Sequence, residues 1–437
     1  MRQMLILGGG TAGTIMANKL ANALDERDWR ITIVDGTDEH YYQPGFLFVP
    51  FGIYQMRDLV RPRRQYLPGK VRYILSGIDR IDAEKKTVML ANGEPLRYDC
   101  LIVATGADIH PEQTEGMLDE EWGRSKFDFY TPRGSERLSS FLKGWQGGKM
   151  VVSIAEMPIK CPVAPLEFLF LADAYFTERG MRDKVDLHLV TPLSGAFTKP
   201  TSSHVLGDVL ERKGISVTPD FAIGRVDGAE KKIVAWDDTE VSYDVLVSIP
   251  TNMGDPCIAR SGMGNELNFV PTNRGTLAAE GLEDVFVIGD ATNVPASKAG
   301  SVAHFESEIL FENIMEHIEG RPPRALFDGH ANCFIESGFG KGMLIDFNYE
   351  TEPLPGAFPL PGVGPFKLLG ESAINHYGKL MFRWVYWNLL LRGVELPIAN
   401  EMLMAGKLVA QWTPCRLRIG LQNSIASLTS SSMSSRI

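Results

Sequence analysis

Residues 3–13 read QMLILGGGTAG, an apolar run that passes directly into a glycine-rich turn. The run predicts a buried strand, and TIMANKLANAL after the turn predicts a helix. Gly8, Gly10 and Gly13 fit the spacing GxGxxG, in which glycines permit a tight turn and bring a helix N-terminus against a pyrophosphate. The next predicted strand, RITIVD, ends at Asp35, where a carboxylate can accept a hydrogen bond from a ribose hydroxyl. The chain therefore opens with a Rossmann-type dinucleotide-binding unit.

Two later stretches indicate which dinucleotide binds. Residues 99–107 (DCLIVATGA) form an apolar strand that ends in Thr105, Gly106 and Ala107, and residues 283–295 (EDVFVIGDATNVP) form another that ends in Gly289 and Asp290. Each stretch alone could equally be a strand end that binds the cofactor or an ordinary strand end. Together with the N-terminal turn they resemble the FAD domain of the two-dinucleotide-domain flavoproteins, the disulfide-reductase-like superfamily. This resemblance implies FAD as the cofactor.

A second Rossmann unit that binds NAD(P)H usually follows in that superfamily. Here residues 149–170 read KMVVSIAEMPIKCPVAPLEFLF, a strand and a helix without GxGxxG between them. The following predicted strand, residues 184–192 (KVDLHLVTP), ends in Thr191 and Pro192 rather than in an acid. We therefore expect a second unit that keeps the fold and lacks the nucleotide.

Cys161 stands where the second phosphate loop would lie. Pro162 suits the first turn of a helix, which places Cys161 near the N-cap. The positive end of the helix and the adjacent Lys160 would then lower the pKa of the thiol. The alternative is a small buried hydrophobic residue, as most free cysteines are. We favour a reactive cysteine because it replaces a phosphate loop.

A second cysteine completes a family pattern. In residues 330–349 (HANCFIESGFGKGMLIDFNY), Cys333 lies in an alternating strand that a Gly-rich turn joins to a second strand, which predicts a β-hairpin. The order GxGxxG, TGA, KCPVAPLEF, GDAT, SKAG and the motif around Cys333 resembles sulfide:quinone oxidoreductase over essentially the whole chain. A relative with similar motifs is the flavoprotein subunit of flavocytochrome c sulfide dehydrogenase.

The resemblance implies that Cys161 and Cys333 flank the flavin and form a disulfide or polysulfide bridge that hydrogen sulfide attacks. It places a proton acceptor on Glu167, and it implies that two electrons pass through FAD to a membrane quinone. Some classes of the family carry a third redox cysteine upstream, but residues 101–160 contain none, so a two-cysteine class is expected. Lys298 is a candidate for the flavin pyrimidine edge, with a surface lysine as the alternative, and His304 is a weaker candidate for proton transfer.

The remaining cysteines are predicted to be structural or incidental. Cys100 begins a buried strand, Cys257 follows a strand, and Cys415 is close to a polar tail. With five cysteines and no CxxC spacing, neither a disulfide scaffold nor a metal site is expected.

The C-terminal part differs in charge from the rest of the chain. Residues 361–437 contain eight Lys and Arg against three Asp and Glu, in a chain whose net charge is −10. Residues 376–393 (HYGKLMFRWVYWNLLLRG) are too short to span a bilayer and rich in Trp, Tyr and Arg, which predicts an interfacial helix on a membrane; a core or dimer helix is the alternative. Phe366 and Tyr377 are candidates for stacking on a quinone and equally for packing. The Ser-rich tail, residues 424–437, is expected to be disordered.

We predict an α/β fold of tandem Rossmann-like domains, the second without its nucleotide motif, followed by a C-terminal membrane-binding domain. The expected bounds are 1–112 with 255–320 for the FAD domain, 113–254 for the second unit and 321–437 for the C-terminal domain. The acidic net charge argues against nucleic-acid binding. No signal peptide is visible, which favours a monotopic protein on the cytoplasmic side of a membrane; a homo-oligomer is possible.

Three alternatives remain open. The flavocytochrome subunit would need an export signal and a cytochrome partner. A type-2 NADH:quinone dehydrogenase would need a nucleotide site in the second unit. A non-catalytic flavin sensor would use the cysteine pair only as a redox switch.

Overall fold

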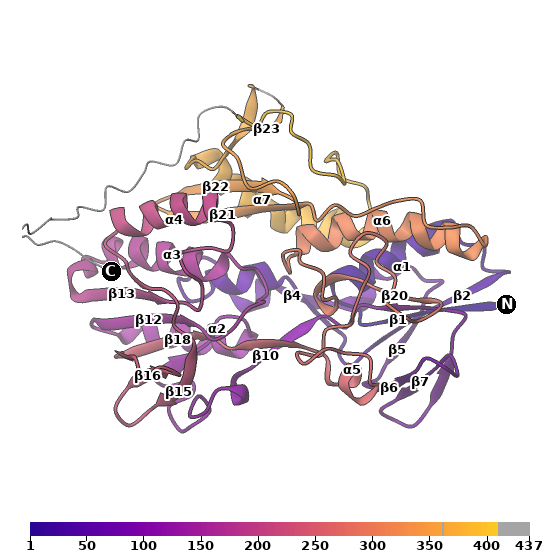
Figure 1. The fold of residues 1–437 in the computed structure, drawn as a ribbon, viewed down its shortest axis with the longest axis horizontal. Coiled ribbons are helices and arrows are strands. Elements are labelled where there is room, and N and C mark those ends of the chain that lie inside the picture. The colour runs from indigo at the N-terminus through magenta and orange to yellow at the C-terminus, as the bar shows by residue number, and fades with distance from the viewer. Residues whose placement is uncertain (361, 410–437) are drawn as a thin grey trace, which may run out of the picture.

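The computed structural model describes residues 1–360 and 362–409 (Figure 1). Cys415 and the Ser-rich tail therefore lie outside the described residues. In the view of Figure 1, one α/β unit lies on the right, a second on the left, and a smaller sheet with helix α7 lies across both at the top.

The first unit is built on a five-stranded parallel sheet in the order β20-β9-β1-β2-β5. Alternate residues of the first strand serve opposite faces, as the strand period requires. Met4 and Ile6 join the core under the helices, whereas Leu5 and Leu7 pack toward an antiparallel ribbon on the other face. The elements of this unit are β1 (Arg2–Leu7), α1 (Thr11–Ala23), β2 (Trp29–Asp35), β3 (Glu39–Tyr41), β4 (Val60–Pro62), β5 (Arg72–Leu75), the ribbon β6 (Ile78–Asp82), β7 (Thr87–Leu90) and β8 (Pro95–Arg97), then β9 (Cys100–Val103), α5 (Pro256–Arg260), β20 (Val285–Val287) and α6 (Gly300–Ile318).

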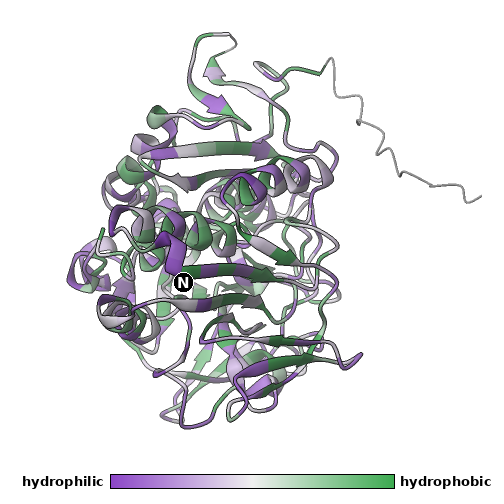
Figure 2. Ribbon diagram, turned by 90° about the vertical axis from the view of Figure 1, so that its left-hand side faces the viewer, coloured by the Kyte–Doolittle hydropathy of each residue, from purple (hydrophilic) through white to green (hydrophobic). Residues whose placement is uncertain are grey.

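The second unit repeats this plan with a parallel sheet in the order β11-β18-β12-β13-β14. Figure 2 shows that hydrophobic residues concentrate along the strands inside the molecule. The antiparallel pair β10–β19 connects the two units. The elements are β10 (Ala107–His110), β11 (Lys126–Phe127), α2 (Pro132–Gly144), β12 (Gly148–Ile154), α3 (Ala164–Glu178), β13 (Val185–Val190), α4 (Pro200–Arg212), β14 (Ser216–Thr218), β15 (Ile223–Asp227), β16 (Lys232–Ala235), β17 (Glu240–Ser242), β18 (Val245–Ile249) and β19 (Thr251–Gly254).

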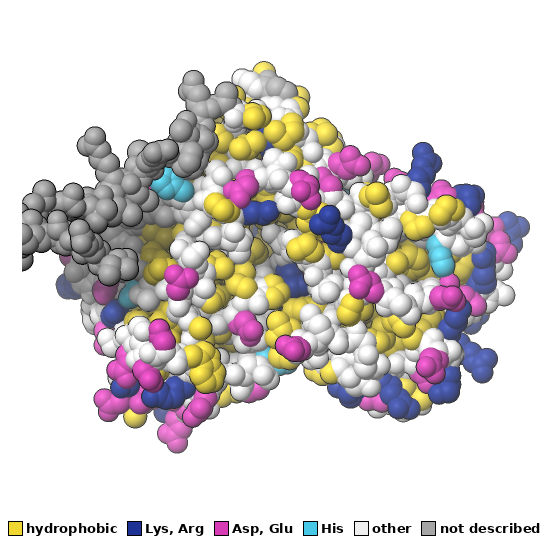
Figure 3. Space-filling view, viewed as in Figure 1, with side chains coloured by type: hydrophobic (Ala, Val, Ile, Leu, Met, Phe, Trp, Pro, Cys, Tyr) yellow, Lys and Arg dark blue, Asp and Glu magenta, His cyan; other side chains and the backbone are white. Residues whose placement is uncertain are grey.

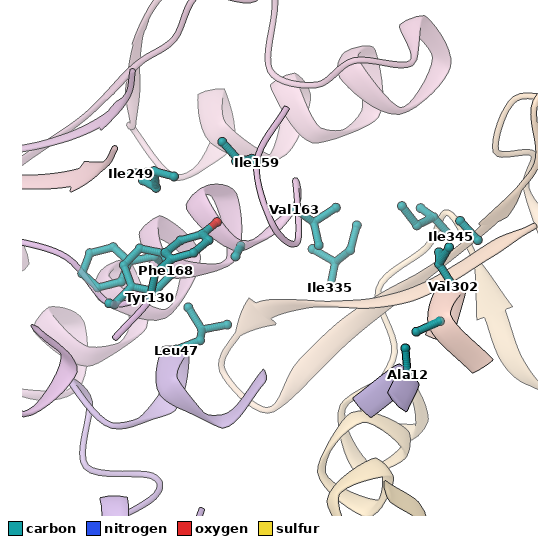
Figure 4. Close-up of a cluster of buried hydrophobic side chains, with 14 of the residues drawn as sticks. Ala12, Leu47, Tyr130, Ile159, Val163, Phe168, Ile249, Val302, Ile335 and Ile345 are labelled. Carbon is teal, nitrogen blue, oxygen red and sulfur yellow. The ribbon is translucent and has the colours of Figure 1, made fainter. Parts of the chain in front are cut away.

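The C-terminal sheet has the order β21-β22-β24-β23, and its first two strands form the hairpin expected around Cys333. These elements are β21 (Ala331–Gly338), β22 (Lys341–Phe347), β23 (Gly356–Leu360), β24 (Gly364–Leu368) and α7 (Ala373–Asn388). Strand β21 packs against α3 of the second unit and α6 of the first. One buried cluster therefore joins all three parts, from Ala12 through Val163 to Ile335 (Figure 4).

The α/β architecture with two Rossmann-type sheets confirms this part of the predicted fold class, whereas the membrane-binding character of the C-terminal domain stays a prediction. The division of the chain at residues 112, 254 and 320 stays a prediction.

Candidate active site

A cavity of ≈ 480 Å³ lies where the three parts meet. It is lined by every residue predicted to bind the cofactor except Gly13: Gly8, Gly10, Asp35, Thr105, Gly106, Ala107, Gly289, Asp290 and Lys298. Cys161 and Glu167 line the same cavity. Segments far apart in the sequence thus contribute to one site.

The N-terminal turn fits a dinucleotide. Gly8 has a φ of +91°, and a Cβ there would lie 2.3 Å from the carbonyl oxygen of Ala104, so the position requires glycine. A Cβ at Gly10 would meet nothing within 4 Å, which leaves open space before the first turn of α1. Gly13 acts through packing instead, since its Cβ would lie 1.9 Å from the carbonyl oxygen of Gly8. In the described chain no side chain caps α1, so its N-terminal N–H groups are available to a phosphate.

The Asp35 carboxylate accepts from two backbone N–H groups, from Gly9 to Oδ2 at 2.7 Å and from Thr37 to Oδ1 at 2.9 Å. Its Oδ2 also lies 3.0 Å from Nη1 of Arg63, which makes an ion pair. Arg63 is buried and also donates to the carbonyl oxygens of Glu39 (2.9 Å) and Thr37 (3.2 Å). The sequence motif locates Asp35 but not Arg63, which begins a short 3₁₀ helix (Arg63–Tyr66) outside the motif.

The floor of the cavity contains a buried lysine rather than a surface one. Lys298 donates to the carbonyl oxygens of Asp290 (2.9 Å) and Thr292 (2.7 Å), and its Nζ lies 3.9 Å from the centre of the Phe269 ring. Burial lowers the pKa of Lys298 and raises the pKa of Asp290. Lys298 therefore fixes the Gly-Asp turn and presents positive charge to the cavity wall.

Two further residues lie behind this turn. Glu306 accepts from the backbone N–H of Gly289 at 2.7 Å, and burial raises its pKa to about 8. His304 is buried and does not line the cavity, and burial lowers its pKa to about 4. The structure therefore does not bring His304 to the place where a proton would be transferred.

Cys161 lies two residues before the N-cap of α3, but the expectation that Pro162 occupies the first turn is wrong. Helix α3 begins at Ala164 with Val163 as its N-cap, so Pro165 rather than Pro162 occupies the first turn. Residues 155–163 leave the second sheet and reach the first unit, where the N–H of Cys161 donates to the carbonyl oxygen of Lys298 at 2.8 Å. Cys161 has a φ of 48°, in the left-handed region. This detour explains how a residue of the second unit lines the cavity of the first.

The expected low pKa of Cys161 is also wrong. Burial raises the pKa of the Cys161 thiol, the charge of Glu167 raises it further, and Lys379 acts in the opposite direction. Lys160 interacts with Asp108 instead, at 3.8 Å. A helix N-terminus and an adjacent lysine do not lower the pKa of this thiol, because Cys161 is desolvated and lies outside the helix.

Cys333 lies next to the cavity wall. In the described part of the chain Cys161 and Cys333 are both free thiols, and charge on Cys333 raises the pKa of Cys161. Burial raises the pKa of Cys333 to about 11, while Lys379 and a hydrogen bond with Ser301 lower it. Cys333 itself is not among the residues that line the cavity. The structure thus brings both thiols into one electrostatic environment.

A buried ion pair links the surroundings of the thiols to helix α7, the predicted interfacial helix. Lys379 of α7 donates to Oε1 of Glu167 and to the carbonyl oxygen of Phe334 at 3.0 Å. Glu167 is fully buried, and its Oε1 also accepts from the N–H of Glu336 at 2.7 Å. Its Oε2 has no hydrogen-bond partner among the described residues. The sequence gives no sign that Lys379 belongs to the site, because this residue lies inside a segment whose composition indicates an interfacial helix.

Opposing effects set the charges of this pair. Burial raises the pKa of Glu167, and Lys379 partly offsets this rise. Burial lowers the pKa of Lys379, but the carboxylates of Glu167 and Glu336 and the Cys161 thiol outweigh burial and raise it. A protonated lysine therefore faces an acceptor oxygen and two thiols.

The two quinone candidates are placed differently. Phe366 packs edge-on against Phe334, with 5.2 Å between ring centroids, and both rings lie over Gly378. Tyr377 is 66% exposed and does not line the cavity, because it points to the outer side of α7. The structure keeps Phe366 near the Cys333 strand and separates Tyr377 from the site.

Comparisons with known proteins agree with this geometry. The family described as pyridine nucleotide-disulphide oxidoreductase matches residues 2–152. The mitochondrial sulfide:quinone oxidoreductases of Dictyostelium discoideum and Mus musculus are each 25% identical to this chain, over 90% of it and 86% of their own length. The structure of the sulfide:quinone oxidoreductase from Aquifex aeolicus matches with a TM-score of 0.75 at 19% identity, over 90% of this chain and 92% of that one. The chain is thus related to the sulfide:quinone oxidoreductases and is an FAD-binding flavoprotein, which confirms the resemblance seen in the sequence.

Proposed function

We propose that this protein is an FAD-dependent sulfide:quinone oxidoreductase that oxidises hydrogen sulfide at Cys161 and Cys333. One observation carries the proposal. Two thiols from separate parts of the chain share the charge of Lys379, and one of them, Cys161, lines the same cavity as the residues predicted to bind the dinucleotide. Relatives named sulfide:quinone oxidoreductase cover nine tenths of the chain, which supports the substrates.

The sulfur chemistry is thiol–disulfide exchange at an oxidised cysteine pair. Hydrosulfide attacks Cys161 of a Cys161–Cys333 disulfide; the bond between the cysteines breaks, a persulfide forms on Cys161, and Cys333 leaves as a thiolate with the bonding electron pair. The cavity exposes Cys161 to the substrate. Cys333 has the less elevated pKa of the two thiols, and the better leaving group is the one with the lower pKa.

Lys379 and Glu167 stabilise the negative charge and accept the proton that this exchange produces. The ammonium group of Lys379 stabilises the thiolate as it forms, in a buried site where charges interact strongly. The unpartnered Oε2 of Glu167 can accept a proton from the incoming sulfide or from the persulfide. FAD, when bound, accepts two electrons for each sulfide oxidised and delivers them to a quinone, while the oxidised sulfur leaves as polysulfide or sulfur.

The outer side of α7 supports contact with a membrane surface and thus access to a lipid-soluble quinone. Ile374, Tyr377, Met381 and Trp384 recur at helical spacing and are 50–66% exposed. Figure 3 shows further apolar side chains gathered at the top of the molecule, around β23. In the described residues no helix has the length and hydropathy to cross a bilayer. An apolar helix face of this kind fits the interfacial plane, and Phe366 is the proposed quinone contact.

The test is anaerobic mixing of the purified flavoprotein with sulfide and, separately, with NADH, while the visible flavin band is followed. Sulfide is expected to bleach the band within seconds, and a short-chain quinone is expected to restore it. Cys161→Ser and Cys333→Ser should each abolish bleaching, whereas Cys257→Ser, at a buried cysteine that does not line the cavity, should retain it. Bleaching by NADH and not by sulfide would overturn the proposal in favour of an NADH:quinone dehydrogenase.

A further inference from the structure

Helix α7 has an inner face as well as an outer one. Lys379 and Tyr386 both line the cavity and are seven residues apart, which is two helical turns and about 10 Å along the axis. Lys379 acts on the charge of both thiols, whereas Tyr386 lies within hydrogen-bond distance of Thr11 at the start of α1. The sulfur chemistry uses Lys379 and leaves Tyr386 without a role.

Tyr386 lies at the centre of a buried hydrogen-bonded group. Its hydroxyl is 2.8 Å from Oγ1 of Thr11 and 2.8 Å from Nε2 of His40. The Tyr42 and Trp387 rings hold the Tyr386 ring edge-on at 5.0 Å and 5.2 Å. Tyr386 and His40 are 1% and 2% exposed, so solvent does not compete for the hydrogen bond between them, whereas Thr11 is half-buried.

All three members of this group are neutral. Burial and the charge of Arg63 lower the pKa of His40 to about 3, and burial raises the pKa of Tyr386. The Tyr386 hydroxyl has one proton for two partners, so it donates to at most one of them and accepts from at least one. The orientation of the Thr11 hydroxyl is thereby coupled to Tyr386.

Thr11 stands at the point where the dinucleotide meets the protein. It is the first residue of α1 and follows Gly10, beside the open space that the turn leaves. Thr11, His40 and Tyr386 all line the cavity. A helix from the C-terminal part of the chain thus closes the pyrophosphate end of a site built by the N-terminal motif.

We propose that Tyr386 is a positioning residue for FAD. It orients Thr11 at the start of α1, so the affinity for the dinucleotide depends on how α7 packs against the first unit. This inference rests on FAD binding and not on the sulfide chemistry. It is measured without sulfide or quinone, so its failure is distinguishable from failure of the proposed function.

The experiment compares the release of FAD from the purified full-length holoprotein and from Tyr386→Phe, followed by the fluorescence of free FAD. Loss of one net hydrogen bond is expected to weaken FAD binding about 3- to 10-fold. Tyr377→Phe, which alters the exposed side of the same helix, is expected to leave FAD binding unchanged. Release within twofold of the wild type in Tyr386→Phe would overturn the inference.

A second variant separates positioning from general stability. Thr11→Val should weaken FAD binding, and adding Tyr386→Phe to it should cause no further loss, because the two hydroxyls act together. The gain in unfolding temperature on adding FAD should shrink in Tyr386→Phe. Fully additive losses, or an equal drop in unfolding temperature at every FAD concentration, would assign Tyr386 a purely structural role.

Discussion

Replacing Lys379 with methionine removes a buried cation that acts on both thiols while keeping much of the side-chain volume. Glu167 then loses its charged partner and keeps one hydrogen bond to Oε1, from the N–H of Glu336 at 2.7 Å. Removing one member of a buried ion pair destabilises a protein by about 3–5 kcal/mol when the other stays charged. Because burial already raises the pKa of Glu167, the carboxyl group retains its proton instead and avoids part of this cost.

The same substitution should slow the chemistry of the thiols. Lys379 lowers the pKa of Cys161 and of Cys333, so both pKa values rise without it. Each unit of increase reduces the thiolate fraction about tenfold below the pKa of the thiol. We expect alkylation of both cysteines by iodoacetamide, measured by peptide mass spectrometry on the reduced holoprotein between pH 7 and 10, to slow about tenfold or more. Lys341→Met, an exposed substitution on β22, is the matched control.

The stability of the Lys379→Met variant should depend on pH with a defined sign. A carboxyl group whose pKa is higher in the folded state binds more protons folded than unfolded, so stability declines as pH rises above the ordinary value. The variant should therefore lose stability relative to the wild type from about pH 5 upward, as measured by urea unfolding. An unchanged alkylation profile together with an unchanged pH slope would refute this account of Lys379.

Three other outcomes are expected. The folded protein keeps the Glu306 proton up to a pKa of about 8, so the stability of the wild type should decline by an amount on the order of a few kcal/mol between about pH 4.5 and pH 8. Glu306→Gln should show a smaller decline in urea unfolding over this range. An equal decline in both proteins would contradict the prediction. Gly13→Ala should reduce bound FAD, measured by absorbance after purification, since its Cβ would lie 1.9 Å from a backbone oxygen of the motif; full FAD content would disprove the close packing. Trp384→Glu should weaken cosedimentation with lipid vesicles about tenfold or more, whereas Trp236→Glu, on a residue that is 79% exposed in the second unit, should not; equal effects of the two would exclude the α7 face.

The dinucleotide end of the site could be predicted from the sequence because its signals are local. Strand, glycine turn, helix and Asp35 follow one another within about thirty-five residues, and their spacing alone fixes their geometry. The hairpin around Cys333 is local in the same sense, since alternating residues and a Gly-rich turn determine its register.

The thiol end could not be predicted from local signals. Two prolines, Pro162 and Pro165, both fit the start of a helix, and only the packing of residues 155–163 against the first unit selects the second. The contact between Lys379 and Glu167 joins residues 212 positions apart. A helix pattern shows that Lys379 and Tyr386 share a face, but it does not show that this face meets a cavity.

The backbone of Cys161 has a consequence for how this chain can change over evolution. A residue other than glycine at a φ of 48° is less stable than glycine there by roughly 1 kcal/mol. The sulfur that we propose to react therefore occupies a position where selection for folding alone would favour glycine or asparagine. A lineage that no longer needed the chemistry would gain stability by replacing Cys161 with glycine, so selection for folding does not by itself retain the thiol.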